Sequence, residues 1–315
     1  MKIIYWNPEI TLNENIAASI GFFDGVHKGH RFLINALKEQ AEKENLLSAI
    51  ITFSEHPRKV LQHTYRPNLI NTLEEKLKLL SELGLDYCIV LPFSQDMANL
   101  TAAEFITDIL SKNLGIKLLL VGYDHRFGKN RSEGFDQYAA YGESCGMKVI
   151  KTPALEDGMQ KYSSTIIRNL LKEGEIKKAA DLLSYSYHLE GIVSKGNQIG
   201  RTIGFPTANI DITDKNKLIP REGVYAVKVF LENKEYNGML YIGSRPTVSA
   251  IKEKRIEVNI FDFNQDIYEK TIGIDFIDFI REDKRFKNIN ELQKQLATDK
   301  ESAQNILLKR EQINS

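Results

Sequence analysis

A chain of 315 residues is about twice the usual length of a single domain, so the sequence predicts two domains of about 150 residues, each with its own core. A composition of 42% hydrophobic and 27% charged residues excludes extended disorder. Equal numbers of basic and acidic residues, 42 of each, argue against a general attraction to nucleic acid or anionic membranes.

Between Ile16 and about Pro153, strand-like apolar runs alternate with segments of helical period. The predicted strands are Ile16–Ile20, Leu46–Phe53, Asp86–Phe93, Lys117–Tyr123 and Lys148–Thr152. The predicted helices cover about 28–44, 74–83, 102–113 and 134–144. Alternation of strand and helix predicts an α/β domain, in which helices cover both faces of a parallel sheet.

After Tyr162 the pattern changes to a helical stretch from Thr165 to about Ser184, followed by six short β-rich runs. These are LEGIVSK, TANIDI, VYAVKVFL, YNGMLYIG, RIEVNIFDF and TIGIDFIDFI. Their close spacing, without helices between them, predicts an antiparallel β-barrel, and a final helix over about 290–310 could pack against it.

The N-terminal residues, the length of the apolar runs and the two cysteines bear on the cellular location of the protein. The first residues, MKIIYWNPEITLNEN, lack a signal peptide, and eighteen consecutive apolar residues occur nowhere. Cys88 and Cys145 form no CxxC or Cys/His cluster, which argues against a disulfide or a transition-metal site. We therefore expect a cytoplasmic protein.

The segment IAASIGFFDGVHKGHRFLINALKEQ runs from an apolar strand through a glycine-rich turn into a helix. Unpaired N–H groups and the macrodipole at a helix N-terminus favour an anion, and Gly21, Gly25 and Gly29 would let the backbone approach it. His27 and His30 bracket Gly29, so both imidazoles face one side and could hold a triphosphate. Either histidine alone would be an ordinary surface or core residue; the combination favours a phosphate site.

A second candidate phosphate clamp lies in SSTIIRNLL, where Ser163, Ser164 and Thr165 precede a helix with Arg168 in its first turn. The ordinary interpretation of the hydroxyls is an N-cap. The alternative is a clamp formed by hydroxyls, helix N–H groups and the guanidinium. The segment alone leaves both open.

These motifs, in this order, resemble the HxGH and (I)SSTxxR signatures of the nucleotidyltransferase superfamily. Between them, TFSEHPRKV and VGYDHRFGKNRSEG resemble the flavin-adenylylating module of bacterial bifunctional riboflavin kinase/FAD synthetases. The resemblance implies a Rossmann-like nucleotidyltransferase domain over residues 1–184. It implies catalytic roles for His27, His30 and Arg168. It implies flavin contacts at His56, Pro57, Asp124 and Arg126. It implies an ATP site made of Gly21, Phe22, Asp24, Gly25, His27, Gly29, His30, Ser163, Ser164, Thr165 and Arg168. Phe22 and Tyr162 depart from the family, which often has Asn and Ile there.

In the second half, GIVSKGNQIGRTIGFPTANIDI combines a basic, glycine-rich turn with a strand, which is either a flexible loop or a lid over phosphates. Thr207 and Asn209 point to the same face of that strand, so a hydroxyl and an amide oxygen could share one Mg²⁺. In RIEVNIFDF, Glu257 shares a face with Asn259 and could act as a general base, although a solvated glutamate is the ordinary interpretation.

The runs GRTIGFPTANI, GVYAVKV, YIGSRPTV, IEVNIFDF and IREDKRF resemble the riboflavin kinase module of the same family. The resemblance implies a kinase domain over residues 185–315, folded as a six-stranded antiparallel barrel. It implies that Thr207 and Asn209 bind Mg²⁺, that Glu257 is the catalytic base and that Arg281 contacts riboflavin. It implies ATP contacts at Lys195, Gly196, Gly200, Arg201, Gly204, Pro206, Thr207 and Asn209. Asn259 departs from the His often found there.

Together the two modules predict two reactions: ATP phosphorylates riboflavin to FMN, and a second ATP adenylylates FMN to FAD with release of pyrophosphate. We expect only small-molecule substrates, no nucleic-acid or membrane partner, and a monomer or weak homo-oligomer. One alternative is an enzyme that has kept one activity beside a degenerate module. Another is a flavin-binding regulator or carrier. The signature residues of both sites are present, which favours the bifunctional enzyme.

Overall fold

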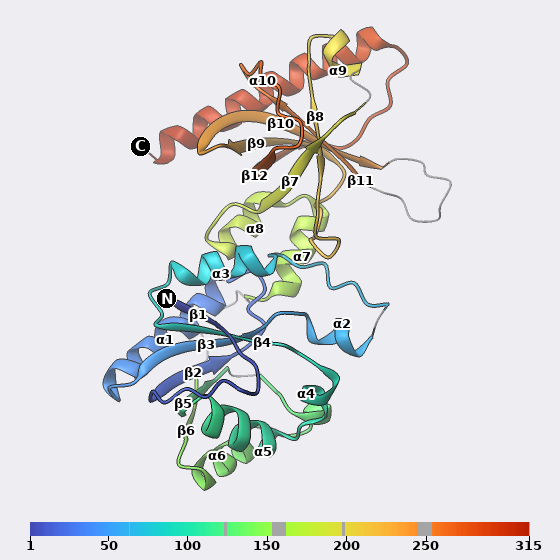
Figure 1. Ribbon diagram of the computed structural model, residues 1–315. Helices are drawn as coiled ribbons and strands as arrows, with labels where there is room; N and C mark the ends of the chain where they lie inside the picture. The colour runs from blue at the N-terminus through green and yellow to red at the C-terminus, as the bar shows by residue number, and fades with distance from the viewer. Residues whose placement is uncertain (63, 123–124, 153–161, 197–198, 245–253, 315) are drawn as a thin grey trace. The chain divides into compact units, whose positions relative to one another are not determined.

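The computed structural model describes residues 1–62, 64–122, 125–152, 162–196, 199–244 and 254–314 (Figure 1). The chain divides into two compact units, Met1–Ser163 and Ser164–Ser315. The assignment of residues 1–184 and 185–315 to separate activities stays a prediction.

The first unit is built on a six-stranded parallel sheet with the order β1-β4-β3-β2-β5-β6. Its strands are β1 (Lys2–Tyr5), β2 (Ile16–Ile20), β3 (Leu47–Phe53), β4 (Tyr87–Leu91), β5 (Ile116–Val121) and β6 (Lys148–Lys151). Its helices are α1 (Lys28–Lys43), α2 (Pro57–Leu61), α3 (Leu73–Ser81), α4 (Gln95–Asn99), α5 (Ala102–Glu104), η1 (Phe105–Asn113), η2 (Lys129–Arg131) and α6 (Phe135–Ser144). The predicted α/β class is confirmed.

Helices cover both faces of this sheet, because its strands are apolar on both sides. On one face, α1 contributes Ile34 and Leu37 and α3 contributes Leu77 to a core with Ile50 and Leu118. On the other face, η1 and α6 pack over a second core. Figure 1 shows α1 and α3 on one side of the strands and α5 and α6 on the other.

The second unit begins with α7 (Ser164–Glu173) and α8 (Ile176–Leu183) and continues into a closed barrel with the order β10-β11-β8-β7-β12-β9. Its strands are β7 (His188–Ser194), β8 (Ala208–Asp211), β9 (Gly223–Leu231), β10 (Lys234–Ser244), β11 (Lys254–Ile260) and β12 (Thr271–Arg281). All their pairings are antiparallel, which confirms the predicted six-stranded barrel. The last helix, α10 (Ile289–Asn314), packs on it through Ala303 and Leu307.

One expectation needs correction in the segment predicted as a glycine-rich loop over residues 196–201. It contains a short helix, α9 (Ile199–Thr202). Backbone N–H groups of Ile203 and Phe205 bond to the carbonyl of Gly200, which closes the turn after the helix. Part of this segment is therefore regular structure.

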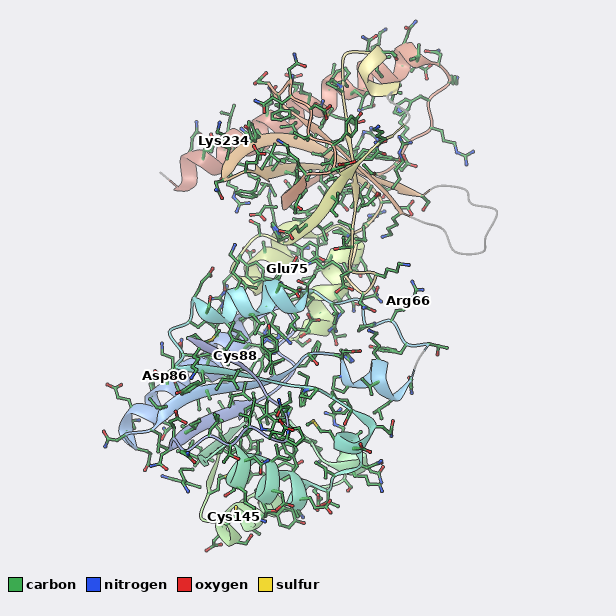
Figure 2. All side chains as sticks on the ribbon, in the orientation of Figure 1. Arg66, Glu75, Asp86, Cys88, Cys145 and Lys234 are labelled. Atoms are coloured by element: carbon green, nitrogen blue, oxygen red, sulfur yellow. The ribbon has the colours of Figure 1, made fainter. Side chains whose placement is uncertain are left out.

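Figure 2 shows Cys88 on β4 and Cys145 just after α6. Both cysteines lie within the described ranges and both are free thiols. Burial raises the pKa of Cys88 to about 12, so this thiol stays protonated at neutral pH. Across the described residues, no helix is long and apolar enough to cross a membrane.

Candidate functional sites

The predicted nucleotide motif lies where the strand order of the first unit reverses. From β2 the chain moves outward through β3 and β4, and it then returns to place β5 on the other side of β2. In open α/β sheets, ligands bind at the carboxyl ends of the strands beside such a switch point. The turn after β2, which carries Gly21 and leads into α1, occupies this position.

The turn between β2 and α1 has an unusual backbone. Phe23, Gly25 and Val26 all have positive φ, at 54°, 91° and 35°. Phe23 and Val26 are buried, so their side chains anchor the turn in the core. Non-glycine residues in the left-handed region cost about 1–3 kcal/mol each and persist only where the surroundings hold them.

His27 and His30 come together at the start of α1, as the motif predicted. Their rings stack with centroids 3.7 Å apart and planes 17° from parallel. His27 is the N-cap, and its Nδ1 accepts a hydrogen bond from the backbone N–H of His30 at 3.4 Å. Nε2 is therefore the nitrogen through which His27 can donate.

His30 is half-buried, and its buried Nδ1 has no hydrogen-bond partner among the described residues. Burial, and then the charges of His27 and Lys76, hold the pKa of His30 well below its ordinary value. The imidazole is therefore neutral at pH 7. Gly29 lies between the two histidines, and a Cβ there would stand 3.1 Å from the Cβ of Tyr162.

Two buried charged residues fix the turn rather than face outward. The carboxylate of Asp24 accepts backbone N–H bonds from Ile70 at 2.9 Å and Asn71 at 3.1 Å. Lys76 on α3 donates from Nζ to the carbonyl oxygens of Phe22 at 3.1 Å and Phe53 at 3.2 Å. Asp24 was predicted as an ATP residue; its visible contacts shape the loop.

The predicted flavin contacts follow the neighbouring strands. His56 caps α2 after β3, with Nδ1 accepting from the N–H of Arg58 at 3.2 Å, and Pro57 is the first residue of that helix. The ring of Phe22 meets His56 edge-on at 4.8 Å between centroids. Arg126 is exposed beyond β5, and Asp124 lies outside the described residues.

The predicted SSTxxR clamp lies at the division between the two units. Ser163 ends the first unit, and Ser164 begins α7 of the second. Thr165 is exposed and Arg168 half-buried in the first turns of α7. That these residues bind the same ATP as His27 and His30 stays a prediction.

In the barrel, the strand register brings the predicted kinase residues side by side. Asn209 on β8 pairs with Glu257 on β11 and with Ser194 on β7. Directly paired residues of antiparallel strands lie on the same face. Thr207, two residues before Asn209, precedes β8 on that face, so a hydroxyl, an amide and a carboxylate lie on one face of the barrel wall.

Sequence reasoning missed the residue that contacts the glutamate. Arg255 lies two positions before Glu257 on β11, and its guanidinium forms an ion pair with the Glu257 carboxylate. The alternation of side chains along a strand could have revealed this pair. Asn259 faces the same side but donates from Nδ2 to the carbonyl of Pro206 at 2.6 Å. It thus ties β11 to the PTAN segment.

Gly196 stands directly against Asn209: a Cβ at position 196 would lie 1.9 Å from the Asn209 amide nitrogen. Only glycine leaves the Asn209 side chain in place. Lys195 lies beside Tyr268, with Nζ 5.9 Å from the ring centroid. Gly200 and Arg201 fall in α9 and Gly204 in the turn after it, at φ 83°. The side chain of Arg201 lies outside the described part of the chain.

Two cavities meet at Thr207. One, of about 280 Å³, has a largely apolar wall and is also lined by Tyr241, Glu257 and Asn259. Its apolar lining residues include Ile203, Phe205, Val224, Leu240, Phe286 and Leu296. The other, of about 490 Å³, lies between Val193, Ile260 and the 263–268 segment. Glu257 lines only the first.

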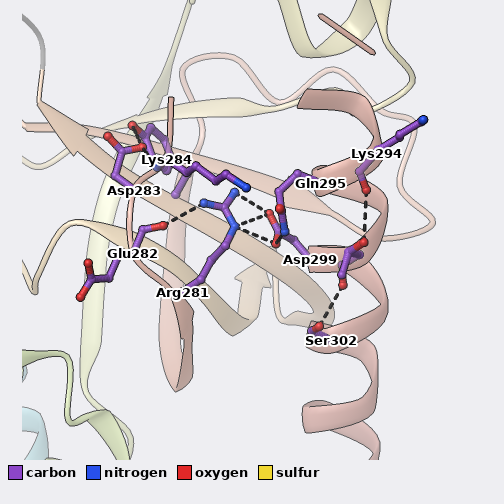
Figure 3. A network of polar contacts seen from close by, with 10 residues as sticks. Arg281, Glu282, Asp283, Lys284, Lys294, Gln295, Asp299 and Ser302 are labelled. Atoms are coloured by element: carbon purple, nitrogen blue, oxygen red, sulfur yellow. Dashed lines mark hydrogen bonds and ion pairs between the residues drawn. The ribbon is translucent and has the colours of Figure 1, made fainter. Parts of the chain in front are cut away.

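Arg281 lines the first cavity, but its guanidinium is engaged by α10 (Figure 3). Nε donates to Asp299 Oδ1 at 2.9 Å, and one terminal nitrogen donates to Oδ2 at 2.7 Å. The other terminal nitrogen donates to the carbonyl of Glu282 at 2.8 Å. Asp299 is only 1% exposed and also accepts from Gln295. The predicted contact of Arg281 with riboflavin stays a prediction.

Comparison with known families matches both halves of the chain. The family model described as FAD synthetase matches residues 9–166, and the model described as riboflavin kinase matches residues 183–307. A solved structure, described as a macrolide-efflux protein from Streptococcus pneumoniae, shares the fold with a TM-score of 0.87 at 34% identity. That comparison covers 96% of this chain and 99% of the other.

Curated relatives carry both activities in one name. The bifunctional riboflavin kinase/FMN adenylyltransferase of Escherichia coli K12 is 37% identical over 291 residues, which is 92% of each chain. The protein of the same name from Bacillus subtilis 168 is 35% identical over 317 residues, covering 96% of this chain and 97% of the other. This chain therefore belongs to the bifunctional riboflavin kinase/FMN adenylyltransferase family, the FAD synthetases of flavin cofactor biosynthesis.

Proposed function

We propose that residues 1–184 adenylylate FMN at the turn between β2 and α1, and that residues 185–315 phosphorylate riboflavin in the barrel. The observation that supports the first assignment is the stacked His27 and His30 pair at the N-terminus of α1. The observation that supports the second is Glu257 paired with Asn209 beside a largely apolar cavity.

In the adenylyl step, a phosphate oxygen of FMN attacks the α-phosphorus of ATP while the bond to the bridging oxygen breaks and pyrophosphate leaves. Charge grows on the leaving group, so donors aimed at it lower the barrier. His27 can donate from Nε2, and neutral His30 can donate one ring N–H. The polyanion would itself raise the pKa of His30, which strengthens this contact when ATP is present.

In the kinase step, Glu257 is proposed to accept the proton of the ribityl 5′-hydroxyl as its oxygen attacks the γ-phosphorus of ATP, while the bond to the β–γ bridging oxygen breaks and ADP leaves. The carboxylate lines the apolar cavity, where the flavin ring system would be removed from water. Arg255 holds the carboxylate in place through an ion pair.

The adjoining cavity, which shares Thr207 with the first, is proposed to take ATP. ATP in this cavity would place its γ-phosphate near Thr207, which also lines the cavity that contains Glu257. Lys195 and α9, at the edge of this region, are proposed to cover the phosphates.

Thr207 and Asn209 fit the proposed Mg²⁺ site, since a hydroxyl and an amide oxygen are the hard ligands that this ion accepts. Gly196 packs directly against the Asn209 amide, so a side chain at position 196 would displace it. When bound there, the ion would offset negative charge on the phosphates of ATP during transfer.

The two assignments can be tested in one chain with Glu257→Gln and His30→Ala. We expect Glu257→Gln to block FMN formation from riboflavin while supplied FMN is still converted to FAD. His30→Ala should form FMN and stop there. Glu190→Gln, an exposed glutamate on β7, is the matched control and should leave both reactions unchanged. FMN formation by Glu257→Gln at the wild-type rate would disprove the role of Glu257 as the base.

Two further points belong to the same proposal. Both reactions consume ATP, which supports a cytoplasmic location, and cell fractionation tests it. A monomer or weak homo-oligomer is proposed, and light scattering over a range of concentrations tests that.

A further inference from the structure

Lys76 is a buried charge beside the turn between β2 and α1 that the proposed chemistry does not use. It lies on α3 and is only 3% exposed. Its Nζ makes three hydrogen bonds, to the carbonyls of Phe22 and Phe53 and to the hydroxyl of Thr52 at 3.0 Å. A buried ammonium has three protons to place, and all three have acceptors here.

These acceptors lie at the carboxyl ends of β2 and β3, where the predicted nucleotide and flavin segments begin. Thr52 Oγ1 also donates to the carbonyl of Phe22 at 3.1 Å, so Lys76 and Thr52 both bond to that oxygen. The ammonium lies 4.3 Å from the centroid of the Phe22 ring, within the range of a cation–π contact. Phe22 is thus held by its carbonyl and by its ring.

The residues that follow Phe22 need such support. Phe23 and Val26 have positive φ, so the turn that delivers His27 is strained. The segment just before α3 makes a second contact with the turn, because the backbone N–H groups of Ile70 and Asn71 donate to the carboxylate of Asp24. Residues 70–76 therefore bond to the turn on both sides of Phe23, at Phe22 and at Asp24.

We propose that Lys76 is a positioning residue for adenylyl transfer, which holds the strained turn after Phe22 so that His27 and His30 meet the departing pyrophosphate. This inference rests on the proposed role of the two histidines. Lys76 lies under the turn, so it acts through the backbone and touches no substrate.

Lys76→Met tests the proposal, because methionine keeps an unbranched side chain of similar length and removes the donors. Displacement of catalytic groups by about 1 Å can cost about 100-fold in rate, so we expect kcat for adenylylation of supplied FMN to fall at least about tenfold. KM for ATP should change less than kcat, because the loss is in alignment with the developing charge. A residue that only anchors a helix would lower the melting temperature and leave kcat of the folded enzyme unchanged.

Two controls separate this effect from general damage. Lys78→Met removes an exposed lysine from the same helix and should leave both activities within about twofold of wild type. Riboflavin phosphorylation by Lys76→Met should also stay within about twofold, since the barrel has its own core. Wild-type kcat for adenylylation in Lys76→Met would overturn the proposal.

Thr52→Val provides a second test if Lys76→Met does not fold. It removes the hydroxyl shared between Lys76 and Phe22 and should lower adenylylation about threefold or more, with phosphorylation unchanged. Unchanged adenylylation in Thr52→Val would count against the proposal. If His30→Ala keeps full adenylylation, the site assignment itself fails; if His30→Ala is inactive and Lys76→Met is normal, only the role of Lys76 fails.

Discussion

His30, which is proposed to contact ATP, also affects the stability of the fold in acid. Burial lowers its pKa in the folded chain, so the unfolded chain binds a proton there at higher pH. An unfolded histidine has a pKa of about 6.5. As pH falls below this value toward the lowered pKa of the folded state, His30 reduces the free energy of unfolding more and more. Above about pH 7.5 this penalty is absent.

We predict that His30→Gln removes this acid penalty, because glutamine does not titrate. Denaturant unfolding at about pH 7.5 and at about pH 5.5 would measure it. Wild type should lose more unfolding free energy between the two values than the variant does. Parallel losses in both proteins would show that His30 is not protonated on unfolding in this range.

At the scale of elements, Asp299 joins β12 to α10 through Arg281 and Gln295 (Figure 3). Removing one member of a buried ion pair costs about 3–5 kcal/mol, and the Arg281 side chain is 20% exposed, so we expect about 3 kcal/mol for Asp299→Ala. Because Leu292 and Leu296 of α10 line the cavity that is proposed to take riboflavin, riboflavin phosphorylation should suffer more than FMN adenylylation.

The matched control is Glu301→Ala, which removes an exposed carboxylate from the same helix and should cost less than about 0.5 kcal/mol. Denaturant unfolding would give the free energy of unfolding of each variant, and assays of riboflavin phosphorylation and FMN adenylylation would give the two activities. Equal losses in Asp299→Ala and Glu301→Ala would mean that the β12–α10 link contributes nothing.

Regular elements were predictable where their pattern is long. The predicted strand Ile16–Ile20 matches β2, and the helix over 28–44 matches α1 within one residue. The edge strand β1 was missed because four residues, of which three are exposed, give no clear alternation. α2 and α4, of five residues each, are too short for a helical period to emerge.

The same limit explains which site residues the sequence could predict. HxGH and PTAN bring their side chains together over three residues or fewer, so local geometry alone suggests a site. Lys76 reaches Phe22 across 54 positions, and Asp299 reaches Arg281 across 18. Such long-range contacts form only in the tertiary structure, so no local sequence motif predicts them.

At the scale of the whole molecule, two compact units have separate cores, and the turn that carries His27 and His30 lies in one unit while Glu257 lies in the other. FMN, the product of riboflavin phosphorylation, is a free small molecule and the substrate of adenylylation. The proposed chemistry therefore does not require one copy of the chain to perform both reactions. One copy could phosphorylate riboflavin and another could adenylylate the FMN.

We predict that a mixture of Glu257→Gln and His30→Ala converts riboflavin to FAD, although neither variant does so alone. FMN made by His30→Ala should diffuse to Glu257→Gln, so it should accumulate before FAD appears, and the lag should shorten as Glu257→Gln is added. Chromatography of the flavins over time would follow this. If each variant keeps its remaining activity but the mixture yields no FAD, FMN must pass between sites of the same chain, and the two units would be coupled in function as well as in sequence.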